Sequence, residues 1–139
     1  MSDTTACISA ASLPSSEALA YLGDAVFELY VREHLVALGI SHAKDLNRLS
    51  LSFVTAEEQA ALLHRIEGCL TAWENDIYHR AYNHKGLKPP KHASYAEYRA
   101  ATGLEAIIGA LHYTGQKERI CELLASLNIK PEKQRKDIL

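Results

Sequence analysis

The segment from Ser16 to Leu38 most constrains the fold, because its hydrophobic residues follow a helical period on two opposite sides. One stripe consists of Ala18, Leu22, Ala25, Val26 and Leu29, and the opposite stripe consists of Ala20, Phe27, Val31 and Leu35. A helix that is apolar on two sides is expected to be buried on two sides. The rest of the chain must therefore pack around this helix, which ends where Gly39 offers a C-terminal cap.

The remaining sequence also repeats the helical period, and no segment shows the alternation of a half-buried strand. We expect further helices at about residues 41–51, 55–67, 71–83, 94–113 and 117–127. Thr55 and Ser94 each precede a glutamate by three residues, which is the capping-box spacing of a helix start. The sequence therefore predicts one all-α domain over residues 16–128, with a flexible N-terminus at 1–15 and a polar C-terminal tail at 129–139.

Length and composition limit the class of protein further. A chain of 139 residues with 47% hydrophobic residues can bury a core without a disulfide or a structural metal. The three cysteines are odd in number and form no CxxC pair, which excludes a disulfide scaffold and a cysteine-based zinc site and suits a reducing cytoplasm. No apolar run reaches the ~18 residues of a membrane span and no export signal is evident, so we expect a cytoplasmic protein without a membrane partner.

Charge is divided unevenly along the chain. Residues 1–75 hold 4 Lys/Arg against 10 Asp/Glu, whereas residues 76–139 hold 11 against 7. The net charge of −2 argues against indiscriminate nucleic-acid binding, yet the asymmetry permits a cationic face opposite an anionic pocket. Two ordinary solvated surfaces are the plainer alternative.

Asp24 lies within the second apolar stripe of the first helix, one turn before Glu28. An unpaired buried carboxylate is costly, so Asp24 must be paired, protonated or bound to a cation. Gly23 precedes it in mid-helix, where glycine is unfavourable and usually allows another backbone to approach closely. The pattern indicates that another element packs against this helix beside Asp24.

Glu105 is a similar exception in the helix at 94–113, where it lies at the centre of a face and is flanked by small residues. These small residues are Gly103, Ala106, Gly109 and Ala110. Two such helices are able to cross closely and bring Asp24 and Glu105 together, and a hard divalent cation would then relieve their repulsion. The alternative is that each acid pairs privately with a Lys or Arg, as Glu28 would with Arg32.

Two segments resemble the ribonuclease III family. Residues 21–29 (YLGDAVFEL) resemble its signature helix, and residues 101–110 (ATGLEAIIGA) resemble its second acidic helix. In the large members of that family four acids surround the metal, and this sequence has Ala20 and Thr102 at two of those positions. Both departures match the small subfamily Mini-ribonuclease III, which also lacks the appended double-stranded-RNA-binding domain. The resemblance extends over roughly residues 17–127 and includes Arg80, Asn83, Pro90, Lys91, Tyr98 and Arg99.

This resemblance implies a Mg²⁺-dependent endoribonuclease that cleaves double-stranded RNA and acts as a symmetric homodimer. Asp24 and Glu105 would be the catalytic residues and the metal ligands. Glu28 and Thr102 are candidates for supporting these two ligands without binding the metal themselves. The typical substrate of the subfamily is the precursor of the large-subunit (23S) ribosomal RNA, so ribosomal proteins or precursor particles are implied partners. A water activated by the metal would attack the phosphodiester and leave 5′-phosphate and 3′-hydroxyl ends.

The basic residues around the Pro-containing loop at 84–93 are the candidates for RNA binding, because an A-form duplex is gripped mainly through its phosphates. They are Arg80, Lys85, Lys88, Lys91 and Arg99, together with Asn83, which either contacts RNA or simply ends its helix. A merely solvated loop is the alternative. His79, His84 and His92 match no zinc spacing and are expected at the surface.

A non-catalytic, helical RNA- or ribosome-associated binding protein of the same fold is the alternative function. Loss of Asp24 or Glu105 would favour it, and both residues are present. A helical carboxylate metalloenzyme of another kind requires Glu-x-x-His pairs on facing helices, which the sequence lacks.

Overall fold

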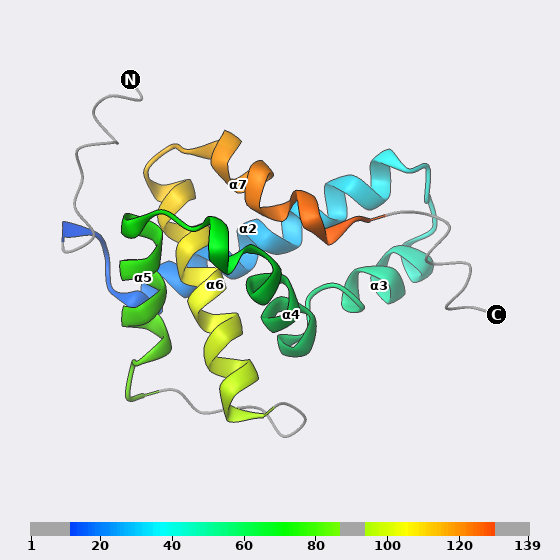
Figure 1. Ribbon diagram of the computed structural model, residues 1–139. Coiled ribbons are helices and arrows are strands. Elements are labelled where there is room, and N and C mark those ends of the chain that lie inside the picture. Colours follow the sequence, from blue (N-terminus) through cyan, green and yellow to red (C-terminus); the bar gives the residue numbers. More distant parts are fainter. Residues whose placement is uncertain (1–11, 87–93, 130–139) are drawn as a thin grey trace.

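The computed structural model describes residues 12–86 and 94–129, and within these ranges it contains six α-helices and no strand (Figure 1). The helices are α2 (Ser16–Ala37), α3 (Ala43–Leu51), α4 (Ala56–Ile66), α5 (Ala72–Tyr82), α6 (Tyr95–Tyr113) and α7 (Lys117–Leu124). Short 3-10 turns at Glu67–Cys69 and Ala125–Leu127 follow α4 and α7. The predicted all-α fold is confirmed, and the helix ends lie close to the expected ones.

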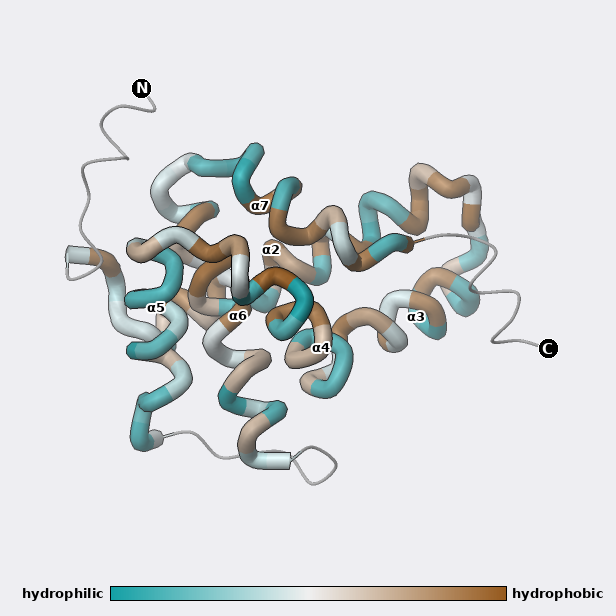
Figure 2. The backbone as a smooth tube through the Cα atoms, in the orientation of Figure 1, coloured by the Kyte–Doolittle hydropathy of each residue, from teal (hydrophilic) through white to brown (hydrophobic). Residues whose placement is uncertain are grey.

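Helix α6 is the centre of the fold, with α2, α4 and α5 packed around it (Figure 1). Between Ala100 and Leu111 every residue of α6 is buried except Glu105, which is partly exposed. Figure 2 shows hydrophobic residues gathered where α4, α6 and α7 face one another, whereas α5 is largely hydrophilic. A charged side chain in so apolar a helix requires a partner or a function.

Helices α2 and α6 cross in backbone contact at two glycines. A Cβ atom at Gly23 would overlap the backbone carbonyl of Glu105, and a Cβ atom at Gly109 would overlap the carbonyl of Leu19. A side chain at either position would force the helices apart, so this crossing requires glycine on both of them. The predicted close crossing is confirmed, and it brings Asp24, the residue after Gly23, beside Glu105. The expectation that Asp24 is buried is wrong, because Asp24 is exposed at the rim of this crossing whereas Glu105 is largely buried.

The expectation that α2 is buried on two sides is wrong for a single chain. The stripe that contains Phe27 and Val31 is buried against the other helices, but the opposite stripe is not. In that opposite stripe Leu29 is 56% exposed, and Ala18 and Ala25 are exposed as well. One chain of this size supplies neighbours to one side of α2 and leaves the other side uncovered within the described ranges. A long apolar helix face at the surface is typical of a surface that meets another molecule.

Side-chain caps define the starts of four helices in the described ranges, and at α2 the Ser15 hydroxyl accepts from the Ala18 N–H. Ser94 and Glu97 form the full reciprocal capping box predicted for α6, whereas Thr55 caps α4 through one hydrogen bond. A further box, formed by Thr71 and Glu74, opens α5 and was not predicted. Each cap satisfies backbone N–H groups that have no partner within the helix.

Several sequence-based predictions concern residues that the structure does not describe. Of the predicted N-terminal segment only residues 12–15 are described, and of the predicted tail only Ile129. Lys88, Lys91 and His92 also lie outside the described residues. No helix in the described ranges is both long enough and apolar enough to cross a membrane.

A buried ion pair joins α5 to α7. The Arg119 guanidinium donates to both carboxylate oxygens of Glu74, at 2.8 and 2.9 Å, and to the carbonyl of Cys69 at 2.8 Å. Glu74 is 2% exposed. Burial alone would raise the pKa of Glu74, but hydrogen bonds from Arg119 and from the backbone of Thr71 outweigh it and hold that pKa below its ordinary value.

Candidate active site

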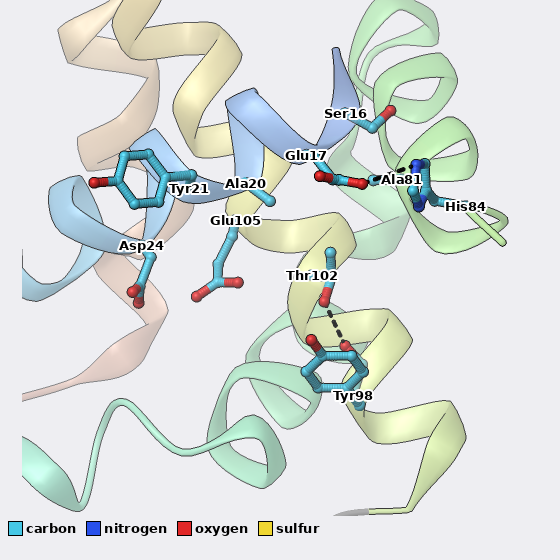
Figure 3. A pocket seen from close by; sticks show the side chains of 10 residues that line it. All are labelled: Ser16, Glu17, Ala20, Tyr21, Asp24, Ala81, His84, Tyr98, Thr102 and Glu105. Atoms are coloured by element: carbon cyan, nitrogen blue, oxygen red, sulfur yellow. Dashed lines mark hydrogen bonds and ion pairs between the residues drawn. The ribbon is translucent and has the colours of Figure 1, made fainter. Parts of the chain in front are cut away.

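A pocket of about 230 Å³ lies between α2, the C-terminal end of α5 and α6 (Figure 3). It is lined by Ser16, Glu17, Ala20, Tyr21 and Asp24 of α2, by Ala81 and His84 at the end of α5, and by Tyr98, Thr102 and Glu105 of α6. Figure 3 shows the Asp24 and Glu105 carboxylates directed to the same side of this pocket. A space of this size has room for several water molecules.

Asp24 and Glu105 are close enough to form a hydrogen bond, and their contact changes the acidity of Glu105. Burial, followed by the hydrogen bond and the negative charge of Asp24, raises the pKa of Glu105 to about 8. A hydrogen bond between two carboxyl groups requires a proton on one of them. The surroundings of Glu105 therefore favour its protonated form near neutral pH unless a cation lies beside the pair.

No Lys or Arg neutralises this pair in the part of the chain that the structure describes, where none of the ion pairs involves Asp24 or Glu105. Glu28 pairs with a basic residue of its own helix, as the alternative interpretation predicted. Its Oε1 lies 3.6 Å from Nη2 of Arg32 on the surface of α2. Its negative charge still contributes to raising the pKa of Glu105. The two acids in the pocket thus remain without a basic partner within the described ranges.

An amide contacts the pair from α4. Nε2 of Gln59 donates to Oε2 of Glu105 at 3.4 Å, and Gln59 is 2% exposed. This residue was not predicted, although the sequence carries a signal for it. Gln59 interrupts the otherwise apolar face of α4 on which Leu62, Leu63 and Ile66 are buried.

Ala20 and Thr102 form part of the pocket wall at the two positions where large members of the resembled family have acids. The Thr102 hydroxyl donates to the Tyr98 carbonyl of its own helix at 2.9 Å (Figure 3). Among the described residues no group of three or more His, Cys, Asp or Glu side chains is arranged to hold a metal ion. A cation in this pocket would therefore take two protein carboxylates and complete its shell with water or phosphate, which suits Mg²⁺.

His84 is partly exposed, as predicted, and it lies in the wall of the pocket. Its Nδ1 accepts a hydrogen bond from the Gly86 N–H at 3.2 Å, so Nε2 carries the proton that faces Glu17 at 3.4 Å. This contact joins the end of α5 to the first turn of α2 (Figure 3). In Figure 3 it lies on the opposite side of the pocket from Asp24.

The described RNA-binding candidates fall into two groups. Arg80, Asn83 and Lys85 are exposed at the C-terminal end of α5, next to pocket residues of the same segment. Arg99 is half-buried and already engaged, because it donates to the Tyr82 carbonyl at 3.0 Å and to the Tyr95 hydroxyl at 2.7 Å. Its guanidinium also lies over the Tyr95 ring, 4.3 Å from the ring centre. Arg99 thus connects the end of α5 to the start of α6.

Comparison with known proteins gives a consistent result. A family model described as Ribonuclease III domain matches residues 17–116. Mini-ribonuclease 3 of Symbiobacterium thermophilum is 48% identical over 106 residues, which cover 76% of this chain and 82% of that protein. Mini-ribonuclease 3 of Enterococcus faecalis is 42% identical over 109 residues, which cover 77% of this chain and 83% of that protein.

A solved structure is similar as well. A crystal structure of a protein from Fusobacterium nucleatum superimposes with a TM-score of 0.76 and 32% sequence identity. The match covers 82% of this chain and 93% of that chain. The matched family segment, residues 17–116, contains both Asp24 and Glu105.

Proposed function

The chain belongs to the ribonuclease III domain family and to its Mini-ribonuclease 3 group, and from this membership we propose that it cleaves double-stranded RNA with Mg²⁺ held by Asp24 and Glu105. Its activity is that of an endoribonuclease. Family membership makes a non-catalytic binding protein the weaker alternative. Members of this family generally depend on a divalent metal, and the assignment of Mg²⁺ to these two residues is our proposal.

The observation that carries the proposal is a pair of carboxylates that meet without a basic side chain. Two acids forced together by the glycine crossing of α2 and α6 repel each other unless a proton or a cation lies between them. Their oxygen atoms are hard ligands, and the pocket beside them has room for water. The donor chemistry therefore fits Mg²⁺ in a site that keeps several positions for water and phosphate.

The residues of this chain have defined tasks in the proposed reaction. Mg²⁺ bound there would polarise the scissile phosphate and lower the pKa of a water molecule. Asp24 and Glu105 would hold it through their carboxylate oxygens, and Glu105 would have to release its proton to serve as a ligand. Glu28 adds negative charge that favours a cation, and Thr102 shapes the wall through its hydrogen bond to Tyr98.

Exposed basic residues support contact with RNA beside this pocket. Arg80 and Lys85 flank the pocket residues Ala81 and His84, and Asn83 offers an amide in the same turn. We propose that these residues, with Lys88 and Lys91 of the following segment, contact the phosphates of the duplex. For Arg99 we propose that its remaining hydrogen-bonding capacity contributes to the same contact.

We also propose a symmetric homodimer in which each site cuts one strand. The uncovered stripe of α2 supports it, because Leu29 is 56% exposed and neighbouring apolar residues Leu22 and Val26 are half-buried. Light scattering at micromolar concentration is expected to give about twice the chain mass of 15.4 kDa. A stable monomer that still makes staggered cuts would contradict the dimer.

The substrate we propose is the precursor of large-subunit (23S) ribosomal RNA, with ribosomal proteins or precursor particles as partners. The reducing cytoplasm is the proposed location, and the free, exposed thiols of Cys69 and Cys121 support it. The substrate is tested by comparing cleavage of a duplex from the ends of the precursor with cleavage of an unrelated duplex of equal length. Equal cleavage of both would contradict a preference for the precursor.

The proposed active site is tested with an isosteric variant. Asp24→Asn is expected to abolish cleavage of long double-stranded RNA in Mg²⁺ while the fold is kept, because an amide is a poor Mg²⁺ ligand. Asp45→Asn on α3 is the matched control, since it makes the same charge change at an exposed pair with Arg48. Near-normal cleavage by pure Asp24→Asn would contradict the proposal.

A further inference from the structure

Gln59 is a polar residue at a position that packing alone would give to an apolar one. It is 2% exposed, and its neighbours on the buried face of α4 include Ala60, Leu62 and Leu63. Burying an amide is costly unless it is hydrogen-bonded, whereas a methionine of similar length would fill the same space without that cost. The hydrogen bond from Gln59 to Glu105 is therefore what distinguishes glutamine from an apolar residue here.

The chemistry of an amide suits this contact in a way that a basic side chain does not. Nε2 of Gln59 fixes the position of Oε2 of Glu105 without adding charge. An arginine at this place would neutralise the carboxylate, as Arg119 neutralises Glu74 elsewhere in the fold. A neutral donor orients Glu105 and leaves the negative charge of the pair available to a cation.

We propose that Gln59 is a positioning residue that holds the Glu105 carboxylate in the orientation that receives the divalent cation. This inference rests on the proposed function of the pocket. None of the residues that line the pocket comes from α4, and the hydrogen bond from Gln59 to Glu105 connects α4 to the site. Groups that orient a metal ligand commonly affect metal affinity and activity without touching the metal.

The test is Mg²⁺ binding to the full-length, RNA-free protein, measured as the rise in melting temperature across a Mg²⁺ series. Gln59→Met is expected to weaken apparent Mg²⁺ affinity by about 10- to 100-fold while the metal-free protein stays folded. Leu62→Met on the same buried face is the matched control and is expected to keep wild-type affinity. Cleavage by Gln59→Met is expected to need more Mg²⁺ for half-maximal rate, which a purely structural role would not produce.

The possible outcomes separate this inference from the proposed function. Wild-type Mg²⁺ affinity in Gln59→Met would overturn the role of Gln59. If Gln59→Met does not fold, Gln59→Asn replaces it, because the shorter side chain keeps an amide but withdraws it from Glu105; wild-type affinity there would overturn the role as well. Absence of Mg²⁺ binding by the wild-type protein would overturn the proposed function itself.

Discussion

Glu74 and Glu105 are both glutamates in helices that pack against the core, yet their surroundings are opposite. Glu74 accepts two hydrogen bonds from Arg119 and one from the Thr71 N–H, and its pKa lies below the ordinary value. Glu105 has an amide and a second acid for neighbours, and its pKa is about 8. The surroundings thus favour the ionised carboxylate at Glu74 and the protonated carboxyl group at Glu105 near neutral pH.

The difference separates an acid that holds the fold together from an acid that is kept for a ligand. Glu74 receives its cation from the chain itself, so it is satisfied as soon as α5 and α7 meet. Glu105 receives no cation within the described ranges, and the fold tolerates the cost at the point where α2 and α6 cross. Strongly perturbed acids in a pocket often mark a functional site, and here the geometry points the same way.

The largest expected effect on stability comes from removing Arg119, the basic residue that pairs with buried Glu74. Arg119→Met leaves Glu74 buried and unpaired, and we expect a loss of about 3–5 kcal/mol in the free energy of unfolding at pH 7. Urea denaturation measures this loss, and the double variant Glu74→Met with Arg119→Met is expected to recover much of it. A loss below about 1 kcal/mol would remove the distinction between the two acids.

A smaller change in stability, this time a gain, is expected when Glu105 is replaced. Between about pH 4.5 and pH 8 the folded protein keeps a proton on Glu105 that the unfolded chain releases, so wild-type stability falls with rising pH in that window. Glu105→Gln lacks this penalty and is expected to be more stable than the wild type above pH 8, by on the order of 2 kcal/mol without Mg²⁺.

Urea denaturation at pH 5 and pH 9 checks this expectation. The advantage of Glu105→Gln is expected to be small at the lower pH and fully developed at the higher one. Glu97→Gln, a substitution of the partly exposed capping residue of the same helix, is the control for placing an amide in α6. Equal stability of Glu105→Gln and wild type at pH 9 would contradict an uncompensated carboxylate.

The smallest expected effect on stability comes from two basic side chains that pair with neither Glu74 nor Glu105. Arg80 and Lys85 are exposed beside the pocket, and Arg80 has only a 3.3 Å contact with exposed Asp76. Arg80→Ala with Lys85→Ala is expected to leave stability almost unchanged but to reduce the salt dependence of RNA binding by roughly 1.5 units of log–log slope.

The slope is measured by binding titrations on double-stranded RNA in an Asp24→Asn background, which prevents cleavage. Lys44→Ala with Arg48→Ala on α3 is the charge-matched control and is expected to leave the slope unchanged. An unchanged slope for the pair beside the pocket would mean that these two side chains are merely solvated.

Much of the fold follows from local signals in the sequence. Hydrophobic period, capping residues and Gly39 define the helices because these features act within one or two turns. The meeting of Asp24 and Glu105 was also predictable, since glycines in mid-helix, such as Gly23 and Gly109, usually allow another backbone to approach closely. The proposal that this pair holds a metal rests mainly on the resemblance to a known family and less on local patterns in the sequence.

The predictions that failed or were missed depend on contacts between distant parts of the chain. Glu74 and Arg119 lie 45 positions apart, so no local pattern indicates that they meet. The hydrogen bond of Gln59 to Glu105 spans 46 positions, and only the polar break in an apolar face hinted at it. The exposure of Leu29 was missed because hydrophobic period alone does not reveal which face of a helix finds a neighbour within the chain.

The most direct measurement is the number of protons that the protein releases when Mg²⁺ binds. Saturating Mg²⁺ is added to RNA-free protein at pH 7 in weak buffer, and the pH change is followed with an indicator. Because the pKa of Glu105 is about 8, we expect close to one proton per chain at pH 7, much less at pH 9.5, and none from Glu105→Gln. Binding of Mg²⁺ to the wild type at pH 7 without proton release would contradict a cation that replaces the proton of Glu105.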